Sequence, residues 1–222
     1  LLGACILVAL IVLGVLMTFL VSRLLSATIL KGVPSSFTLE MPPYRRPQIL
    51  KVIVRSIVDR TLKVLGRAVI SAAPAGLLIW VLANVPLSGQ TTLLTALTGF
   101  LDPFARRLGM DGCILTGFLL GLPANEIVVP IIIMTYMARG SLLEVEGVQL
   151  MQLFTANGWT WITAVSTLLF SLMHWPCATT LLTIRKESGS LKWTLLSFLV
   201  PTVCGIILCF LFTTAALFLF PA

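Results

Sequence analysis

Five stretches of apolar residues, separated by short polar segments, dominate the chain. A helix needs about 20 apolar residues to cross the hydrocarbon core of a bilayer. The third stretch is interrupted at Pro123 and the fourth at Pro176. Because backbone polar groups inside a bilayer must be paired within the protein, this pattern predicts an all-α polytopic membrane protein. Its third and fourth units are then half-helices or re-entrant segments. The five units cover residues 1–28, 68–85, 113–137, 159–184 and 193–220.

Residues 48–67 show a helical period in which apolar and charged positions separate onto two faces. This pattern predicts an amphipathic helix that lies along the membrane surface, and its basic residues place it in the cytoplasm. A helix that simply leads into the second span is a compatible alternative. The apolar face holds Leu50, Ile53, Val54, Ile57, Val58, Leu62 and Leu65, and the charged face holds Lys51, Arg55, Asp59, Arg60 and Lys63.

The remaining segments connect these elements. Residues 33–47 form a proline-rich connector, residues 86–110 a loop with a short helix over 91–108, and residues 139–157 a loop with Glu144 and Glu146. The turn at 185–192, RKESGSLK, faces outward if both broken units cross the membrane and lies in the cytoplasm if one of them is re-entrant. The sequence leaves this choice open.

We expect three parts: a transmembrane helix over residues 1–30, a cytoplasmic connector with the amphipathic helix over 31–67, and a C-terminal transmembrane domain over 68–222. Leu1 already lies inside a hydrophobic run, so we expect a piece of a longer protein rather than a signal peptide.

Composition supports a membrane protein. The chain is 58% hydrophobic and 10% charged, with a mean hydropathy of +1.07, whereas soluble domains carry about 25% charged residues. The net charge of +7 lies mainly between the hydrophobic segments. The positive-inside rule explains this charge better than a nucleic-acid partner does. The five cysteines show no paired spacing of the disulfide or zinc type.

Glu126 and Asn125 are the first candidate site residues, because they directly follow the break at Pro123. A charged residue at the centre of a membrane helix costs ~2.5 kcal/mol or more, so it is retained where it faces a partner, a cavity or an ion. Pro123 suits the first position of a downstream half-helix, which would place both residues in its first turn. Glu126 then either caps that turn and offsets the helix dipole, or offers an oxygen to a cation.

Cys177 and His174 flank the second break at Pro176 in a similar way. A lone histidine is more often a structural, hydrogen-bonded residue than a ligand. Thr179 and Thr180 either donate hydroxyls to the site or bond back to freed carbonyls. A soft sulfur ligand with oxygen donors suits a divalent transition metal. We therefore expect Glu126 and Cys177 to line one polar cavity near the middle of the membrane, with the metal candidates Cys177, Glu126, Asn125 and His174.

Several catalytic signatures do not occur in the sequence. There is no GxxxxGK[ST] phosphate loop, no HExxH zinc motif and no GxSxG nucleophile elbow. We therefore expect no catalysis, and no bound cofactor, within this chain.

Three segments resemble the C-terminal membrane region of the ferrous iron transport protein B (FeoB) family. LEMPPYRRP at residues 39–47 is similar to that family's ELPPYR-type connector. GFLLGLPANEIVVP at 117–130 and SLMHWPCATTLLTIRKESGSLKW at 171–193 are similar to the two signature stretches of its second Gate motif. The resemblance covers nearly the whole chain.

This resemblance implies transport of Fe(II) across a bacterial inner membrane. Cys177 matches the Pro-Cys that the family is proposed to use along the iron path, and Glu126 matches an acidic position of its other signature. GTP and Mg²⁺ would bind an upstream GTPase domain, and a first Gate motif would also lie upstream. The expected partners are membrane lipids and Fe(II), with a small accessory protein and a homo-oligomer left open, and no nucleic acid.

Two other functions are compatible with the sequence. A Gate-type transporter of another solute, such as a nucleoside, would need polar residues suited to a sugar or base, and Cys177 argues against it. A non-transporting scaffold that anchors the GTPase would not depend on Glu126 or Cys177.

Overall fold

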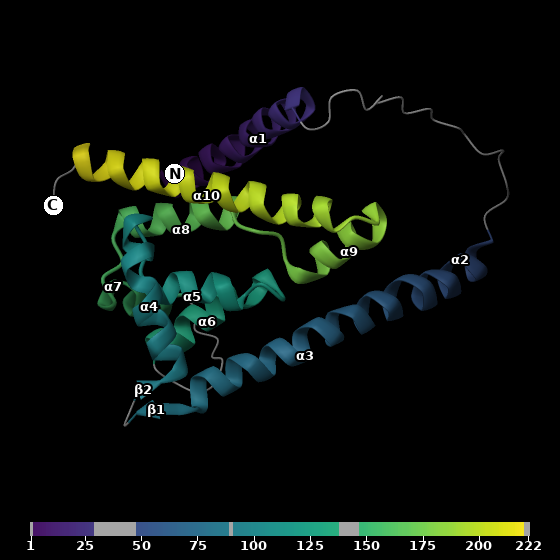
Figure 1. The fold of residues 1–222 in the computed structure, drawn as a ribbon, viewed down its shortest axis with the longest axis horizontal. Helices are drawn as coiled ribbons and strands as arrows, with labels where there is room; N and C mark the ends of the chain where they lie inside the picture. The colour runs from purple at the N-terminus through teal and green to yellow at the C-terminus, as the bar shows by residue number, and fades with distance from the viewer. Residues whose placement is uncertain (1, 29–47, 89–90, 138–146, 220–222) are drawn as a thin grey trace. The chain divides into compact units, whose positions relative to one another are not determined.

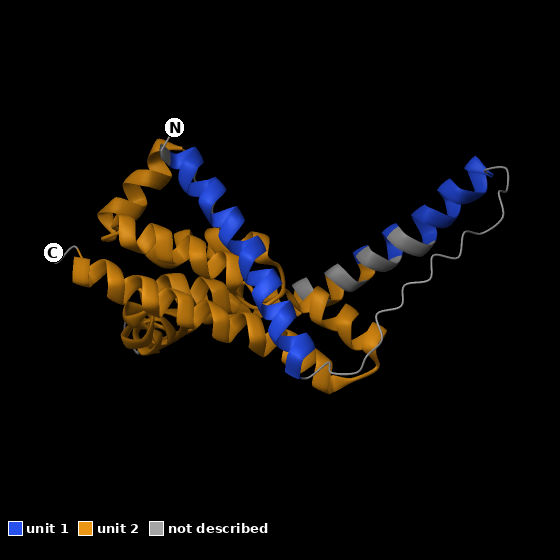
Figure 2. Cartoon of the chain, turned by 90° about the horizontal axis from the view of Figure 1, so that it is seen from above, with its two compact units in different colours: residues 1–65 blue, residues 66–222 orange. Residues whose placement is uncertain are grey.

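The computed structural model describes residues 2–28, 48–88, 91–137 and 147–219, which are almost entirely helical (Figure 1). They divide into two compact units, residues 1–65 and residues 66–222, shown in different colours in Figure 2. The expected connector over 33–47 and the acidic residues Glu144 and Glu146 lie outside the described residues. The division into three functional parts stays a prediction.

The first unit contains α1 (Leu2–Thr28), α2 (Ile49–Ser56) and the π-helix η1 (Ile57–Leu62). Within α1, residues Gly3–Thr28 are long and apolar enough to cross a membrane. The helix expected over 48–67 is confirmed, since α2, η1 and α3 follow one another without a break in helical backbone. Every residue of α2 is exposed, so the described part of the chain covers neither its apolar nor its basic face.

The second unit begins along α3 (Lys63–Asn84), which contains the second predicted span and continues through Pro74. A short hairpin of β1 (Pro86–Ser88) and β2 (Thr91–Thr92), which the sequence did not suggest, turns the chain into α4 (Leu93–Arg107). The short helix expected over 91–108 is therefore confirmed. The Thr92 hydroxyl caps α4 by accepting from the Thr95 amide at 3.3 Å.

The break at Pro123 is confirmed: α5 (Gly112–Leu120) ends before it, and η2 (Asn125–Ile127) and α6 (Val128–Tyr136) follow it. The two α-helices form an antiparallel hairpin, visible as neighbouring ribbons in Figure 1. Close contacts pair Gly117 with Ile132 near its middle and Gly121 with Val128 near its tip. Each helix has nine residues, so each extends only ~13.5 Å against a core of ~30 Å. The third unit therefore turns back on itself as a hairpin, as the re-entrant alternative expects.

The break at Pro176 is also confirmed, between α8 (Trp161–Met173) and α9 (Ala178–Ser188). α10 (Leu191–Leu219) continues through Pro201 and packs along both of them (Figure 1). Residues Trp161–Ser188 and Leu191–Leu219 are each long and apolar enough to cross a membrane. Gly189, with φ of 63°, ends α9 in the left-handed conformation that glycine adopts easily.

One expectation about this region is wrong. Residues 139–157 were expected to form a loop, but their described part contains the helix α7 (Val148–Ala156). Apolar residues recur there at helical spacing, at Leu150, Leu153 and Phe154, and these are only partly exposed. Glu144 and Glu146, earlier in the segment, favoured the interpretation as a loop over this short helical pattern.

Two clusters hold the second unit together. An apolar cluster joins the end of α3 to α4 and the hairpin through Ile79, Ala83, Leu94, Leu120, Ile131 and Met134. A small polar cluster joins α8 to α10. There the hydroxyl oxygens of Ser166 and Thr213 lie 3.3 Å apart, and the Cys209 thiol donates to the Ser166 carbonyl at 3.5 Å. Small hydroxyl and thiol side chains of this kind allow membrane helices to approach closely.

Replacing Gly117 by alanine should loosen the hairpin. A Cβ at Gly117 would lie 2.5 Å from Cγ1 of Ile132, and such overpacking typically costs about 1–3 kcal/mol. We expect the thermal unfolding midpoint of the purified protein in detergent to fall by several degrees. Gly99→Ala is the matched control, because nothing lies within 4 Å of its Cβ position. Equal midpoints for the two variants would contradict this packing.

Candidate functional site

The two breaks meet. The backbone amide of Ala178, the first residue of α9, donates to the carbonyl of Leu122 at 2.8 Å. Leu122 lies in the turn that connects α5 to η2. Each break leaves backbone groups without a partner in its own helix, and such groups must be satisfied inside the protein. We call the two contacting segments, residues 121–127 and 174–178, the junction.

Cys177 occupies the N-cap position of α9 at the junction. Its Sγ lies 3.1 Å from the Oγ1 atoms of both Thr179 and Thr180, and its side chain is half-buried. The placement of this thiol at the start of a half-helix, predicted from Pro176, is therefore correct. The arrangement surrounds one polarisable sulfur atom with two hydroxyl groups.

His174 ends α8 on the other side of Pro176. Its Nδ1 lies 2.8 Å from the Ser171 carbonyl oxygen. Because a carbonyl can only accept, Nδ1 carries a proton, and in the neutral ring Nε2 then keeps a free lone pair. Nε2 is buried and has no hydrogen-bond partner among the described residues. The imidazole ring packs against Phe118 of α5, with ring centroids 5.1 Å apart.

Trp175 was not anticipated as a junction residue. Its indole is buried, with 7% of its surface exposed, and stacks on Phe198 of α10 with centroids 5.7 Å apart. Its Nε1, like Nε2 of His174, is buried with no hydrogen-bond partner within the described part of the chain. The junction therefore holds one donor and one acceptor, on adjacent residues, that have no hydrogen-bond partner among the described residues.

Glu126 and Asn125 lie on the hairpin side of the junction, in the short helix η2. Ala124, not Pro123, precedes this helix, so Pro123 lies in the turn rather than at the first helical position. Both side chains are exposed, and neither makes a hydrogen bond or ion pair with another described residue. The structure thus brings the two breaks together, whereas a cavity shared by Glu126 and Cys177 stays a prediction. A role for Glu126 in offsetting the helix dipole remains compatible with its position.

The candidate metal ligands do not form a closed cage. Within the described residues, no three side chains of His, Cys, Asp or Glu gather as a metal-binding group. Structural metal sites are usually complete and closed, while sites that exchange their ligands keep open positions.

α10 supports the junction from a third side. A Cβ at Gly205 would lie 3.3 Å from both Cβ and the carbonyl oxygen of Met173, the last residue of α8. Gly205 and Phe198 therefore determine how closely α10 approaches the break. A glycine in a long apolar helix is a weak sequence signal for such a contact, and sequence reasoning missed it.

A polar cluster closes the other end of the hairpin. Asp111 caps α5 by accepting from the Ile114 amide at 2.8 Å, and it also accepts from the Tyr136 hydroxyl. The Tyr136 oxygen in turn accepts from Nε1 of Trp159 at 2.7 Å.

Nearby, burial alone would raise the pKa of Asp102. Hydrogen bonds from the Gly112 amide at 3.0 Å and from Arg106 Nε at 2.6 Å outweigh burial and lower that pKa below its ordinary value.

An all-α membrane bundle in which two proline-broken units meet at their breaks has the architecture of membrane transport proteins. Comparison with protein families agrees with this class. The family described as "Ferrous iron transport protein B C terminus" matches residues 7–60, and the Gate family, described as "Nucleoside recognition", matches residues 65–191. The chain belongs to the Gate family, and its resemblance to the C-terminal region of ferrous iron transport protein B is confirmed.

Curated relatives carry the name Fe(2+) transporter FeoB. One from Staphylococcus aureus (strain MSSA476) is 31% identical over 90% of this chain and 30% of its own length. One from Synechocystis is 28% identical over 95% of this chain and 33% of its own length, and one from Methanocaldococcus jannaschii is 26% identical over 82% and 28%. The chain thus spans about a third of the length of the relatives it matches. No solved structure matches it significantly.

Replacing Gly205 by valine should push α10 away from the junction. The branched side chain would overlap Met173, and overpacking of this kind costs about 1–3 kcal/mol. We expect a lower unfolding midpoint and faster maleimide labelling of Cys177, measured by peptide mass spectrometry. Ile207→Val, at an exposed position of the same helix, should change neither quantity. Unchanged labelling in Gly205→Val would show that α10 does not support the junction.

Proposed function

We propose that this chain forms part of a path for Fe(II) across a bacterial inner membrane, as the C-terminal membrane part of a GTPase-linked ferrous iron transporter. The observation that carries the proposal is the junction, where Ala178 and Leu122 join two broken units next to the Cys177 thiol. The names of the curated relatives support iron as the substrate. GTP and Mg²⁺, a GTPase domain, a first Gate motif, an accessory protein and a homo-oligomer belong to this proposal as features outside the chain.

The chemistry of the junction suits a divalent transition metal. Cys177 offers a soft sulfur, and Nε2 of His174 offers an imidazole lone pair with no protein partner among the described residues. Glu126 and Asn125 offer hard oxygens from the hairpin side. Mixed soft and hard ligands favour Fe(II) over Na⁺ or Mg²⁺. An incomplete ligand set binds strongly enough to repay dehydration and weakly enough to release the ion.

A nucleoside is the alternative substrate that the description of the Gate family suggests. The groups that converge on the junction are a thiol, an imidazole and threonine hydroxyls, and the curated relatives are named for iron. Both observations favour the metal. The scaffold alternative predicts that these side chains do not affect metal flux, and the substitutions below test that prediction.

The re-entrant hairpin suggests an orientation. If α3 crosses from the cytoplasm, the hairpin returns to the outer side, and α8 with α9 then crosses inward. The turn with Arg185, Lys186 and Lys192 becomes cytoplasmic, as the positive-inside rule favours. The hairpin tip, with Glu126, would then enter the membrane from outside.

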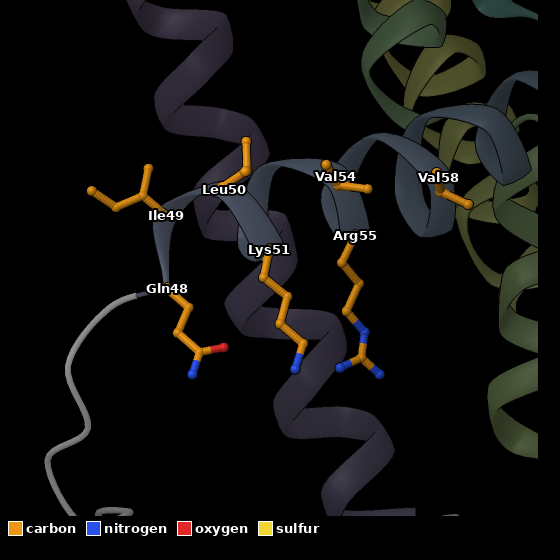
Figure 3. A pocket seen from close by; sticks show the side chains of 7 residues that line it. All are labelled: Gln48, Ile49, Leu50, Lys51, Val54, Arg55 and Val58. Atoms are coloured by element: carbon orange, nitrogen blue, oxygen red, sulfur yellow. The ribbon is translucent and has the colours of Figure 1, made fainter.

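The same orientation places α2 at the cytoplasmic membrane surface. Figure 3 shows Gln48, Lys51 and Arg55 on one side of this helix, with Leu50 pointing away from them. An apolar face in the lipid boundary with a basic face toward the headgroups fits such a helix. Its helical continuity with α3 is equally compatible with the alternative in which the helix leads into the second span.

Cysteine accessibility tests this orientation. Lys51→Cys and Glu187→Cys should react with an impermeant maleimide only from the cytoplasmic side, and Asn157→Cys only from the outer side. All three positions are exposed in the structure. The measurement compares intact cells with inverted vesicles. Labelling of positions 157 and 187 from the same side would contradict a crossing through α8 and α9.

Anaerobic iron uptake tests the function. Cys177→Ser keeps the size of the side chain but loses the soft thiolate, and Glu126→Gln keeps its shape but loses the charge. We expect each change to lower Fe(II) uptake by ~10-fold or more, as removal of metal-site groups commonly does. Cys5→Ser and Glu187→Gln, at exposed positions, are the matched controls at equal expression. Parent uptake rates in both site variants would favour the scaffold alternative.

A further inference from the structure

We propose that Tyr136 is a positioning residue, which fixes the α5–α6 hairpin against α8 and thereby holds the hairpin tip at the Cys177 break. The part of this inference that concerns iron rests on the proposed function. The part that concerns the position of the hairpin does not. Neither Tyr136 nor its partners belong to the candidate metal ligands.

One hydroxyl group connects three helix ends. Tyr136 is the last residue of α6, Asp111 caps α5, and Trp159 lies two residues before α8. The Tyr136 hydroxyl donates to Oδ2 of Asp111 and accepts from Nε1 of Trp159 at 2.7 Å. All three side chains are half-buried, where water competes less well for these bonds.

Each partner of Tyr136 is itself held in place. The other carboxylate oxygen of Asp111 accepts from the Ile114 amide at 2.8 Å, which anchors it to α5. The indole of Trp159 stacks on Phe154 of α7, with ring centroids 4.1 Å apart and planes at 6°. The Tyr136 hydroxyl therefore joins fixed groups on the hairpin to a fixed group at the start of α8.

The hairpin contacts the fourth unit at two further places, one in the middle of α5 and one at the hairpin tip. In the middle of α5, Phe118 packs edge-on against Phe170 of α8, with ring centroids 4.9 Å apart. At the tip, the Ala178 amide donates to the Leu122 carbonyl at 2.8 Å. This bond and the Trp159–Tyr136 bond are two hydrogen bonds that link the hairpin to residues 159–188.

The Trp159–Tyr136 bond joins the hairpin to the fourth unit at one end, and the Ala178–Leu122 bond joins them at the hairpin tip. Together the two bonds define the position of the hairpin relative to α8. If the base is released, the hairpin can slide or tilt along the apolar surface of α8, because contacts such as Phe118–Phe170 are not directional enough to fix one register. The tip bond would then open more often and expose Cys177. Local opening of this kind is measurable in the folded protein.

The test uses Tyr136→Phe, Trp159→Phe and the double variant in the complete protein. Tyr136→Phe keeps the ring and removes both hydrogen bonds, while Trp159→Phe removes only the bond between Trp159 and Tyr136. Trp80→Phe, at an exposed position of α3, controls for loss of an indole. The readouts are the rate of maleimide labelling of Cys177, the unfolding midpoint, and the maximal rate of Fe(II) uptake at equal expression.

We expect Tyr136→Phe to label at Cys177 ~5-fold faster than the parent below its unfolding temperature, because the junction opens locally. Trp159→Phe should give a smaller increase, and Trp80→Phe none. The double variant should match Tyr136→Phe, since both changes act through one shared bond. The variant with the fastest Cys177 labelling should also have the lowest maximal rate of Fe(II) uptake, and Trp159→Phe should lie between Tyr136→Phe and the parent in both measurements.

Three results would overturn the proposal. A lower unfolding midpoint with unchanged Cys177 labelling would make Tyr136 purely structural. Additive effects in the double variant would show that the two residues act independently. Should Tyr136→Phe fail to fold, unchanged labelling in Trp159→Phe would decide against the proposal. Altered labelling without altered uptake would support the positioning role and count against the proposed iron path.

Discussion

The constraint on which this structure depends is the pairing of backbone polar groups inside a bilayer. Pro123 and Pro176 each interrupt a membrane unit and leave amide or carbonyl groups without a partner in their own helix. The chain satisfies part of this demand across the two breaks, through the bond from the Ala178 amide to the Leu122 carbonyl. One interruption therefore helps to satisfy the other, and the two segments stay in contact.

This pairing also determines where chemistry can occur. Residues at a break project from irregular backbone, so Cys177 can occupy the N-cap position of α9 and His174 can end α8 within the same short segment. Close packing supports that arrangement: Gly117 allows α5 to approach α6, and Gly205 allows α10 to approach α8. For the proposed ion path, such a closely packed segment would offer ligands to a passing ion without a permanent cage.

The sequence predicted the all-α membrane class, both breaks and the position of Cys177 at a half-helix start, because prolines and apolar runs are local signals. It did not predict the direction of the third unit. That direction depends on contacts between distant residues, such as the hydrogen bond between Asp111 and Tyr136, which are 25 positions apart. The helix α7 was missed because it is short, and the role of Trp175 was missed because stacking on Phe198 leaves no pattern in the sequence.

We propose that a metal ion on its path contacts the Cys177 thiolate at the junction. Co(II), a spectroscopic substitute for Fe(II), gives an intense thiolate-to-metal charge-transfer absorption when sulfur is bound. The account predicts that the complete protein, titrated anaerobically with Co(II), shows this band and that Cys177→Ser abolishes it while Cys5→Ser does not. A band of equal intensity in Cys177→Ser, or no band in the parent protein, would contradict the account.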